Sequence, residues 1–222
     1  MKYLFANGCS FLQNRTAKGL SLNAGSELAS KLGLEHINYA KGGRGNDRII
    51  ATTKTFFSSN KDKMKDTFAL IGWSASLRID YLCNKKPAWM SVKFDEELSV
   101  YQKRGGIDVK SHLAMRHINH ILCLQDFFKI NKIPYLMYNS LTNDVISDDN
   151  DDVNQLSTEI DKNNFFNISN SHHQWCRKND LCINGDKNSK DWDEHPSKAG
   201  QIKWSDELFN HIKNKNILNV RN

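Results

Sequence analysis

Short apolar segments alternate with amphipathic segments along most of the chain, and this alternation constrains the fold more than any other feature. The apolar segments typical of buried strands are residues 2–6, 36–40, 67–72, 134–138 and 165–168. Apolar residues at helical spacing begin near Ser26, Asn46 or Asp47, Ser111 and Ser197. Strands that alternate with helices favour a parallel sheet covered on both faces. We therefore expect an α/β fold whose ligands bind at the carboxyl ends of the strands.

Two segments interrupt this pattern within what we expect to be one domain over residues 1–222. Residues 81–106 include Trp89 and lack a clear helical or strand period, which indicates an insertion or a lid. Residues 144–161 contain seven acidic residues and neither Lys nor Arg, which predicts an acidic surface loop. The rest of the chain is therefore more basic than the net charge of +6. Its basic residues form no dense run, which disfavours binding to nucleic acid.

The composition argues against a membrane span, a disulfide framework and a metal site. No apolar run approaches the ~20 residues that cross a bilayer, and Met1–Ala6 is too short for a signal peptide, so we expect a cytoplasmic protein. The five cysteines are an odd number without zinc-type spacing. His117 and His120 share a predicted helix face, but no carboxylate accompanies them in ligand spacing. We expect reduced thiols, no metal and no cofactor. Self-association into a homo-oligomer stays open.

A serine that could act as a nucleophile follows the first apolar segment, within Asn7–Phe11 (NGCSF). A tight turn containing glycine would expose the Ser10 hydroxyl at the rim of the sheet, with backbone amides beside it. Because a serine hydroxyl is a weak nucleophile at neutral pH, it needs a base. The same residues also suit an ordinary turn between a strand and a loop. The segment therefore predicts catalysis only in combination with a base.

The best candidate base lies near the far end of the chain, within Asp191–Ser197 (DWDEHPS). His195 stands just ahead of the closing helix, and Asp193 two residues earlier can hold its ring in one tautomer. The alternative interpretation is an acid-rich helix N-terminus capped by Ser197.

These segments, together with a third, resemble the SGNH (GDSL-like) hydrolase superfamily. Gly8–Phe11 is similar to the block that carries the family's nucleophile, and Asp193–Pro196 to the block that carries its acid and base. Asn38–Asn46 (NYAKGGRGN) is similar to the block in which a glycine amide helps to bind the oxyanion.

The resemblance implies both an architecture and a set of roles. The architecture is a flavodoxin-like three-layer sandwich with about five central parallel strands. The implied triad is Ser10, His195 and Asp193. The implied oxyanion donors are the amides of Ser10 and Gly43, with Gly45 as the alternative glycine.

Two positions depart from the family pattern. The family usually has its acid three residues before the histidine, where this chain has Trp192, so Asp193 takes the role and Asp191 is the fallback. The third block normally brings Gly-x-Asn-Asp after the third strand, whereas Ser74 stands here in place of the asparagine. Ser74 is therefore the predicted third donor, and Asn139 is an alternative. The loss of one oxyanion donor costs roughly 10²–10³ in turnover.

The activity implied by the resemblance is hydrolysis of an ester, such as an O-acetyl group on a carbohydrate. We place Asn46, Trp73 and Arg78 at the substrate site, where Arg78 would meet an anionic group or, alternatively, form a surface ion pair. The missing asparagine favours a second hypothesis, a weak or inactive SGNH-like module that binds a glycan or a protein. A basic protein that binds nucleic acid is the third and least favoured hypothesis.

Overall fold

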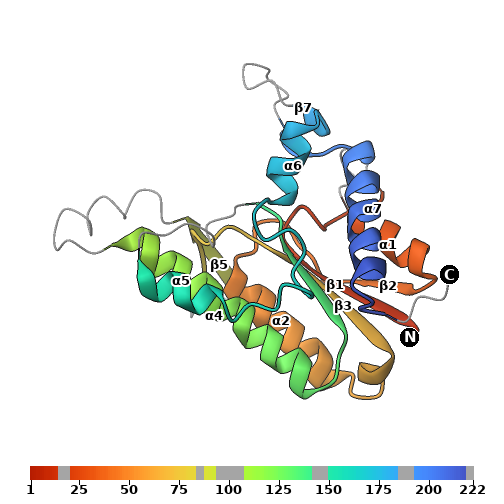
Figure 1. Ribbon diagram of the computed structural model, residues 1–222, viewed down its shortest axis with the longest axis horizontal. Coiled ribbons are helices and arrows are strands. Elements are labelled where there is room, and N and C mark those ends of the chain that lie inside the picture. Colours follow the sequence, from red (N-terminus) through yellow and green to blue (C-terminus); the bar gives the residue numbers. More distant parts are fainter. Residues whose placement is uncertain (15–20, 84–87, 94–107, 142–149, 185–192, 219–222) are drawn as a thin grey trace.

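Four parallel strands form the centre of the protein, in the order β2-β1-β3-β6 (Figure 1). The structure is a computed structural model that describes residues 1–14, 21–83, 88–93, 108–141, 150–184 and 193–218. The strands are β1 (Tyr3–Gly8), β2 (Glu35–Asn38), β3 (Thr67–Trp73) and β6 (Tyr135–Asn139). This order is of the flavodoxin type, in which ligands bind beyond the carboxyl ends of the strands. The expected parallel α/β sheet is confirmed.

The prediction of a fifth sheet strand at 165–168 is wrong. Phe165 makes only a single parallel bridge, with Met137 of β6. The Phe166 amide donates to the Met137 carbonyl, but within the described residues the pairing does not extend into a ladder. The apolar residues at this position are instead used to cover the sheet, since Phe165 is buried. The central sheet therefore has four strands rather than five.

Helices cover both faces of the sheet, which completes the three-layer sandwich (Figure 1). One face carries α1 (Ala24–Leu32) and α7 (Lys198–Asn214), and the other carries α2 (Asn46–Ser59) and α4 (Val109–Ile130). Successive strand residues point to opposite faces. Phe5 therefore packs with Phe56 in the core under α2 and α4, while Leu4 packs with Trp204 in the core under α1 and α7.

The irregular insertion expected at 81–106 begins as an ordered hairpin. Strands β4 (Arg78–Cys83) and β5 (Ala88–Lys93) pair antiparallel, and Trp89 lies on β5. Asp80 anchors this hairpin to the start of α2, because its Oδ2 accepts the Arg48 amide at 3.1 Å and its own amide donates to Asp47 Oδ2 at 3.0 Å. These contacts of Asp80 join residues more than 30 positions apart, so no local sequence pattern indicates them. Residues 94–106 of the expected lid lie outside the described residues.

The acidic loop expected at 144–161 contains a helix, α5 (Asp151–Ser157). The Asn150 side chain accepts the amides of Asp152 and Val153, and acidic residues in a first turn are stabilised by the helix dipole. Val153 and Ile160 are buried against the core under α4. The expectation of a loop was wrong, because capping by Asn150 and acids in the first turn stabilise a helix despite the high density of negative charge. Residues 142–149 lie outside the described residues.

A short helix and an antiparallel pair stand above the carboxyl ends of the strands. Helix α6 (His172–Lys178) precedes an antiparallel pair, β7 (Cys182–Asn184) and β8 (Asp193–Pro196). A short 3-10 helix, η2 (Met64–Asp66), leads into β3. None of the described helices is both long and apolar enough to cross a membrane.

Strands β1 and β3 approach each other closely where both contain glycine. Gly8 is in register with Gly72, and a Cβ added to Gly8 would lie 2.6 Å from the Gly72 carbonyl oxygen. We predict that Gly8→Ala lowers the free energy of unfolding by about 1–3 kcal/mol, the usual cost of overpacking. Urea denaturation measures the loss, with Ser30→Ala on the exposed side of α1 as the control. An unchanged denaturation midpoint would show that the strands can separate freely.

Candidate active site

The loop after β1 presents Ser10 at the carboxyl edge of the sheet. Two contacts from distant parts of the chain hold this loop. Asn38 Nδ2 donates to the Leu12 carbonyl at 3.0 Å, and Gln201 Nε2 of α7 donates to the Phe11 carbonyl at 3.1 Å. The Ser10 side chain is half-buried. The serine is therefore accessible on a loop that is tied down on both sides.

Three residues predicted to act together do lie together. His195 Nε2 is 2.8 Å from Ser10 Oγ, although 185 positions separate the two residues in the chain. His195 Nδ1 is 2.7 Å from Asp193 Oδ1, which also accepts the His195 amide at 3.0 Å. With Nδ1–H donated to the carboxylate, Nε2 has a lone pair to take the serine proton. Asp193, two residues before the histidine, thus occupies the acid's place, while Asp191 lies outside the described residues.

A second set of contacts fixes the loop that carries His195. Glu194 points away from the triad, and its Oε2 is 3.0 Å from His173 Nε2 of α6. Arg177 Nη1 of the same helix lies 3.4 Å from Glu194 Oε1. On the other side, the Phe11 ring lies 5.0 Å from the His195 ring, centroid to centroid. No residue spacing in the sequence indicates this clasp, the set of contacts that Glu194 of β8 makes with α6.

The glycine-rich turn after β2 lies beside the nucleophile. A Cβ added to Gly42 would be 3.8 Å from Ser10 Cβ, and the Gly42 amide already donates to Gln13 Oε1 at 2.6 Å. Gly43 has a φ of +75° and open space around its Cα. Within the described residues, neither the Gly43 amide nor the Ser10 amide donates to a protein acceptor. Both amides are therefore available to a ligand oxygen.

Gly45, the alternative oxyanion glycine, is packed away from this opening. A Cβ there would lie 2.7 Å from the Arg78 carbonyl oxygen, and Gly45 is the N-cap of α2. Of the two glycines predicted as oxyanion donors, Gly43 has open space around it and Gly45 does not.

Ser74 follows β3 as Ser10 follows β1. Each is two residues beyond a glycine of the Gly8–Gly72 pair, so both belong to the same edge of the sheet. Asn46 holds the Ser74 backbone from both sides, because its Oδ1 accepts the Ser74 amide at 2.8 Å and its Nδ2 donates to the Ser74 carbonyl at 3.2 Å.

Two of the predicted substrate contacts are wrong. Asn46 has both groups of its side-chain amide engaged, the oxygen by the Ser74 amide and the nitrogen by the Ser74 carbonyl and by His117 Nδ1, 2.8 Å away. Trp73 is fully buried in the core under α2 and α4, because its position in β3 turns its side chain inward. Arg78 is half-buried, with its Nη1 3.4 Å from Ser74 Oγ.

Asn139, the alternative third donor, also faces the core. It is in register with Trp73 on β6 and is fully buried, and its Oδ1 lies 3.3 Å from His117 Nε2. His117 thus links Asn46 to Asn139 beneath the site. A histidine on an otherwise apolar helix face was the only sequence signal for this buried connection, and it does not reveal the partners.

A buried histidine supports the nucleophile loop from below. His172 is fully buried, and its ring stacks on the Trp204 indole at a centroid distance of 4.5 Å. The Phe11 ring meets its edge at 5.5 Å. Burial lowers the pKa of His172 well below its usual value, and the neighbouring His173 acts in the same direction. The ring is therefore neutral at pH 7.

Other features of the described residues carry no catalytic arrangement. No group of three or more His, Cys, Asp or Glu side chains among them could hold a metal ion.

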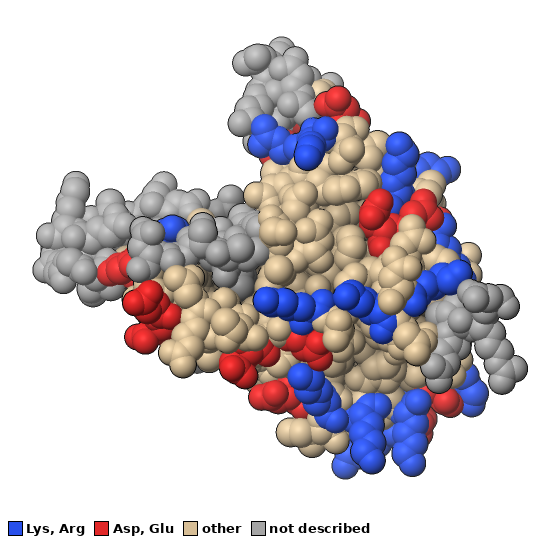
Figure 2. All heavy atoms as spheres, viewed as in Figure 1, with Lys and Arg blue, Asp and Glu red and all other residues tan. Residues whose placement is uncertain are grey.

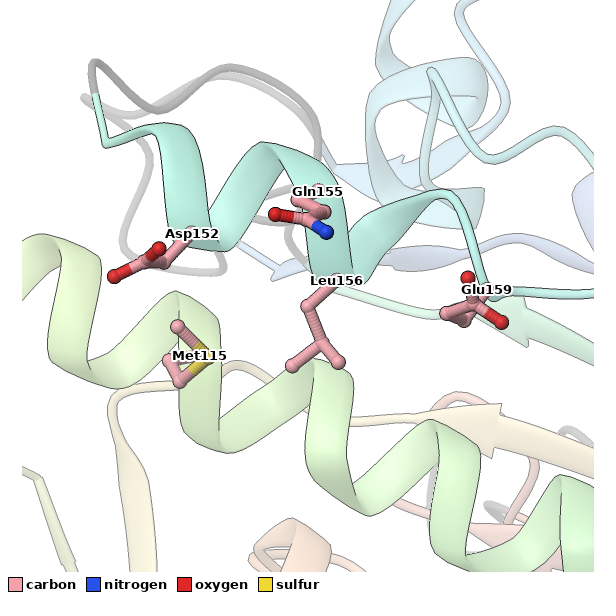
Figure 3. Close-up of a pocket in the computed structure, with 5 residues that line it drawn as sticks. All are labelled: Met115, Asp152, Gln155, Leu156 and Glu159. Carbon is pink, nitrogen blue, oxygen red and sulfur yellow. The ribbon is translucent and has the colours of Figure 1, made fainter.

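A pocket of about 250 Å³ lies between α4 and α5, with Asp152 and Glu159 at its ends (Figure 3). It is lined by residues of α4, α5 and the turn after α5, outside the loops that carry Ser10 and His195. Figure 2 shows Lys and Arg intermixed with Asp and Glu on the face it presents.

Comparison with solved structures places the fold. The psychrotrophic esterase EstA from Pseudoalteromonas sp., in a structure inhibited by monoethylphosphonate, matches with a TM-score of 0.51 and 12% identity, over 96% of this chain and 98% of that one. A proposed G-D-S-L family lipolytic protein from Desulfitobacterium hafniense matches with a TM-score of 0.46 and 8% identity, over 98% and 100% of the two chains. A proposed acylhydrolase from Bacteroides fragilis gives 0.41 and 12%, over 98% and 88%.

These similarities concern structure and not sequence. No protein-family model and no curated protein matches the chain. At 12% identity the first structure establishes the fold alone. The protein shares the three-layer α/β fold of this esterase, and a fold of this architecture is what the sequence resemblance implied.

The depressed pKa of His172 makes a prediction for stability against pH. Because the folded state resists protonation of this ring and the unfolded state does not, its contribution to stability is complete above about pH 6.5 and is lost as the pH falls. We expect the wild type to lose up to about 1.4 kcal/mol more per pH unit than His172→Phe between pH 6.5 and 5. Urea denaturation at each pH measures the slopes, with His112→Gln at an exposed position on α4 as the control. Equal slopes in wild type and His172→Phe would contradict the assignment.

Proposed function

We propose that the protein is a serine hydrolase of SGNH type that cleaves esters with Ser10 as nucleophile, His195 as general base and Asp193 as the acid that orients the base. One observation carries the proposal: the continuous hydrogen-bonded path from Ser10 Oγ to His195 Nε2 at 2.8 Å, and from His195 Nδ1 to Asp193 Oδ1 at 2.7 Å. This path stands at the carboxyl edge of a parallel sheet, where such folds bind ligands.

The chemistry follows from the geometry. His195 Nε2 takes the Ser10 proton as Oγ attacks the ester carbonyl, and the amides of Ser10 and Gly43 receive the negative charge that develops on the carbonyl oxygen. The protonated ring then gives its proton to the departing alcohol, which leaves an acyl group on Ser10. A water molecule, deprotonated by His195, attacks this acyl group and restores the serine.

The substrate we propose is a small ester, with an O-acetyl group on a carbohydrate as the first candidate. This choice rests on the resemblance to the SGNH superfamily. Release of acetate from acetylated sugars, compared with release from acyl esters of increasing chain length, tests the choice. Faster hydrolysis of long-chain esters would replace the carbohydrate ester with a lipid-like one.

Loss of the nucleophile is the first test of the proposed function. We expect Ser10→Ala to lower kcat/KM for 4-nitrophenyl acetate by at least about 10³-fold, because no other group on this path can attack the carbonyl. Ser30→Ala, on the exposed side of α1, should keep wild-type activity. Wild-type hydrolysis that survives in Ser10→Ala would remove Ser10 from the mechanism.

Covalent labelling separates a weak enzyme from an inactive one. A fluorophosphonate should transfer its phosphonyl group to Ser10 Oγ with release of fluoride, and mass spectrometry should find the added mass on the peptide that contains Ser10. A wild-type protein that neither turns over esters nor takes the label would instead favour an SGNH-like module that binds a glycan or a protein.

Two adjacent carboxylates allow a matched test of the acid. Asp193 bonds the His195 ring, whereas Glu194 bonds His173. We expect Asp193→Asn to lower kcat on the order of 10²- to 10⁴-fold, since the amide no longer stabilises the protonated ring. Glu194→Gln should stay within about threefold of the wild type, because the Gln carbonyl oxygen can still accept a hydrogen bond from His173 and so keep the loop of His195 in place, while hydrolysis routes no proton through this side chain. The opposite ranking of the two variants in steady-state kinetics would assign the acid to Glu194.

A further inference from the structure

The position that lacks the family's amide donor is not an isolated hydroxyl. Ser74 is buried, and its amide is occupied by Asn46 Oδ1, so only its hydroxyl can act on a substrate. That hydroxyl has a charged neighbour, because Arg78 Nη1 lies 3.4 Å from Ser74 Oγ and can donate to it. A hydroxyl that accepts one hydrogen bond still has its own proton to give.

Arg78 is held between the parts of the site that surround Ser10. It is the first residue of β4, and its carbonyl oxygen packs at the Cα of Gly45 in the glycine-rich turn. Its charge also reaches the residue beside the nucleophile. Burial raises the pKa of the Cys9 thiol, and the positive charge of Arg78 is among the influences that oppose this rise.

The described residues around Arg78 do not neutralise its charge. Among the described residues no carboxylate forms an ion pair with Arg78, whereas Arg48 pairs with Asp80 and Arg116 with Asp47. A surface ion pair, the alternative role expected for Arg78 from the sequence, is therefore not found in the described part of the chain. A half-buried guanidinium beside Ser74, without a carboxylate partner among the described residues, favours a negatively charged group at this edge of the sheet.

We propose that Arg78 and Ser74 together replace the missing asparagine, with the guanidinium donating to Ser74 Oγ and the Ser74 hydroxyl donating to the oxyanion. The proposal rests on the proposed ester hydrolysis and adds to it a positioning residue that acts through Ser74. A neutral hydroxyl can rotate and accept rather than donate. The hydrogen bond from Arg78 occupies a lone pair of Oγ and leaves its proton directed outward.

The physical advantage of the pair is charge. Hydrogen bonds in chains polarise one another, so a hydroxyl that accepts from a cation is a stronger donor than a hydroxyl alone. The guanidinium is separated from the oxyanion only by the Ser74 hydroxyl. Its positive charge therefore also stabilises the negative charge of the transition state, because the medium between them has a low dielectric. The Ser74 hydroxyl with Arg78 beside it can thus stabilise the oxyanion more strongly than a serine hydroxyl alone.

A double-mutant cycle on the intact chain tests this coupling with two substrates. The variants are Ser74→Ala, Arg78→Met and the double variant, assayed with neutral 4-nitrophenyl acetate and with a 4-nitrophenyl ester whose acyl chain ends in a carboxylate. We expect each single variant to lower kcat by about 10- to 100-fold on both esters, with KM little changed. The double variant should be no more than about threefold below Ser74→Ala, because Arg78 has nothing left to polarise.

A second variant distinguishes coupling from a merely structural role. Ser74→Asn restores an amide donor that needs no polarisation, so Arg78→Met should cost less than about threefold in that background. Arg116→Met, which removes a guanidinium paired with Asp47, is the matched control and should leave kcat within about threefold of the wild type. Thermal denaturation of every variant checks that the fold is kept.

Three outcomes would overturn the proposal. The first is full activity of Arg78→Met, and the second is losses in kcat that multiply in the double variant, which would make the residues independent. The third is a rise in KM confined to the ester with the carboxylate, which would make Arg78 a binding group for an anionic substrate. Fluorophosphonate labelling of Ser10 in each variant keeps these outcomes apart from a failure of the proposed hydrolysis, which would leave the wild type itself unlabelled and inactive.

Discussion

The close approach of β1 and β3 at Gly8 and Gly72 is the constraint on which the site depends. A side chain at Gly8 would meet the Gly72 carbonyl oxygen, and without one the two strands stay in register to this pair. Ser10 and Ser74 each follow two residues later, so the backbone pairing sets their separation before any side chain is considered. The proposed nucleophile and the proposed oxyanion donor are thus both positioned by the sheet, and regular elements hold a site more precisely than loops do.

The base reaches this edge by a different route. His195 sits on the short β7–β8 pair, which is not part of the central sheet. It is placed by contacts of its own: the hydrogen bond that its Nδ1 donates to Asp193, the packing of Phe11 against its ring, and the contacts of Glu194 with α6. The site is therefore assembled from two supports, one covalently continuous with the sheet and one docked onto it.

Sequence reasoning predicted the parts of this protein that depend on local pattern. Alternating apolar segments correctly predicted the four strands, and Ser197 correctly marked the start of α7, whose first turn its side chain caps. The adjacency of Ser10 and His195 followed from the order of the blocks. What failed depends on tertiary contacts, since the direction of the Trp73 side chain and the burial of Asn46 follow from which face of β3 and α2 meets the core.

Other failures have different physical causes. Residues 165–168 have the composition of a strand, but only one bridge to β6 forms, and Phe165 is used to cover the core. Helix α5 was not predicted because its many acidic residues are typical of a surface loop, although the Asn150 cap and the helix dipole favour a helix there. The clasp between α6 and β8 joins residues about 20 positions apart with no repeat or motif. Such pairings are set by the fold and leave little trace in a single sequence.

The docking of the β7–β8 pair has a consequence for how the proposed triad is lost on heating. A two-stranded pair has little backbone pairing of its own, and it is held mainly by side-chain contacts to α6 and to the nucleophile loop. Regions of this kind open at lower free energy than the sheet on which they rest. Heating should therefore separate His195 from Ser10 while the four parallel strands are still paired, so that the catalytic arrangement is a less stable unit than the fold that carries it.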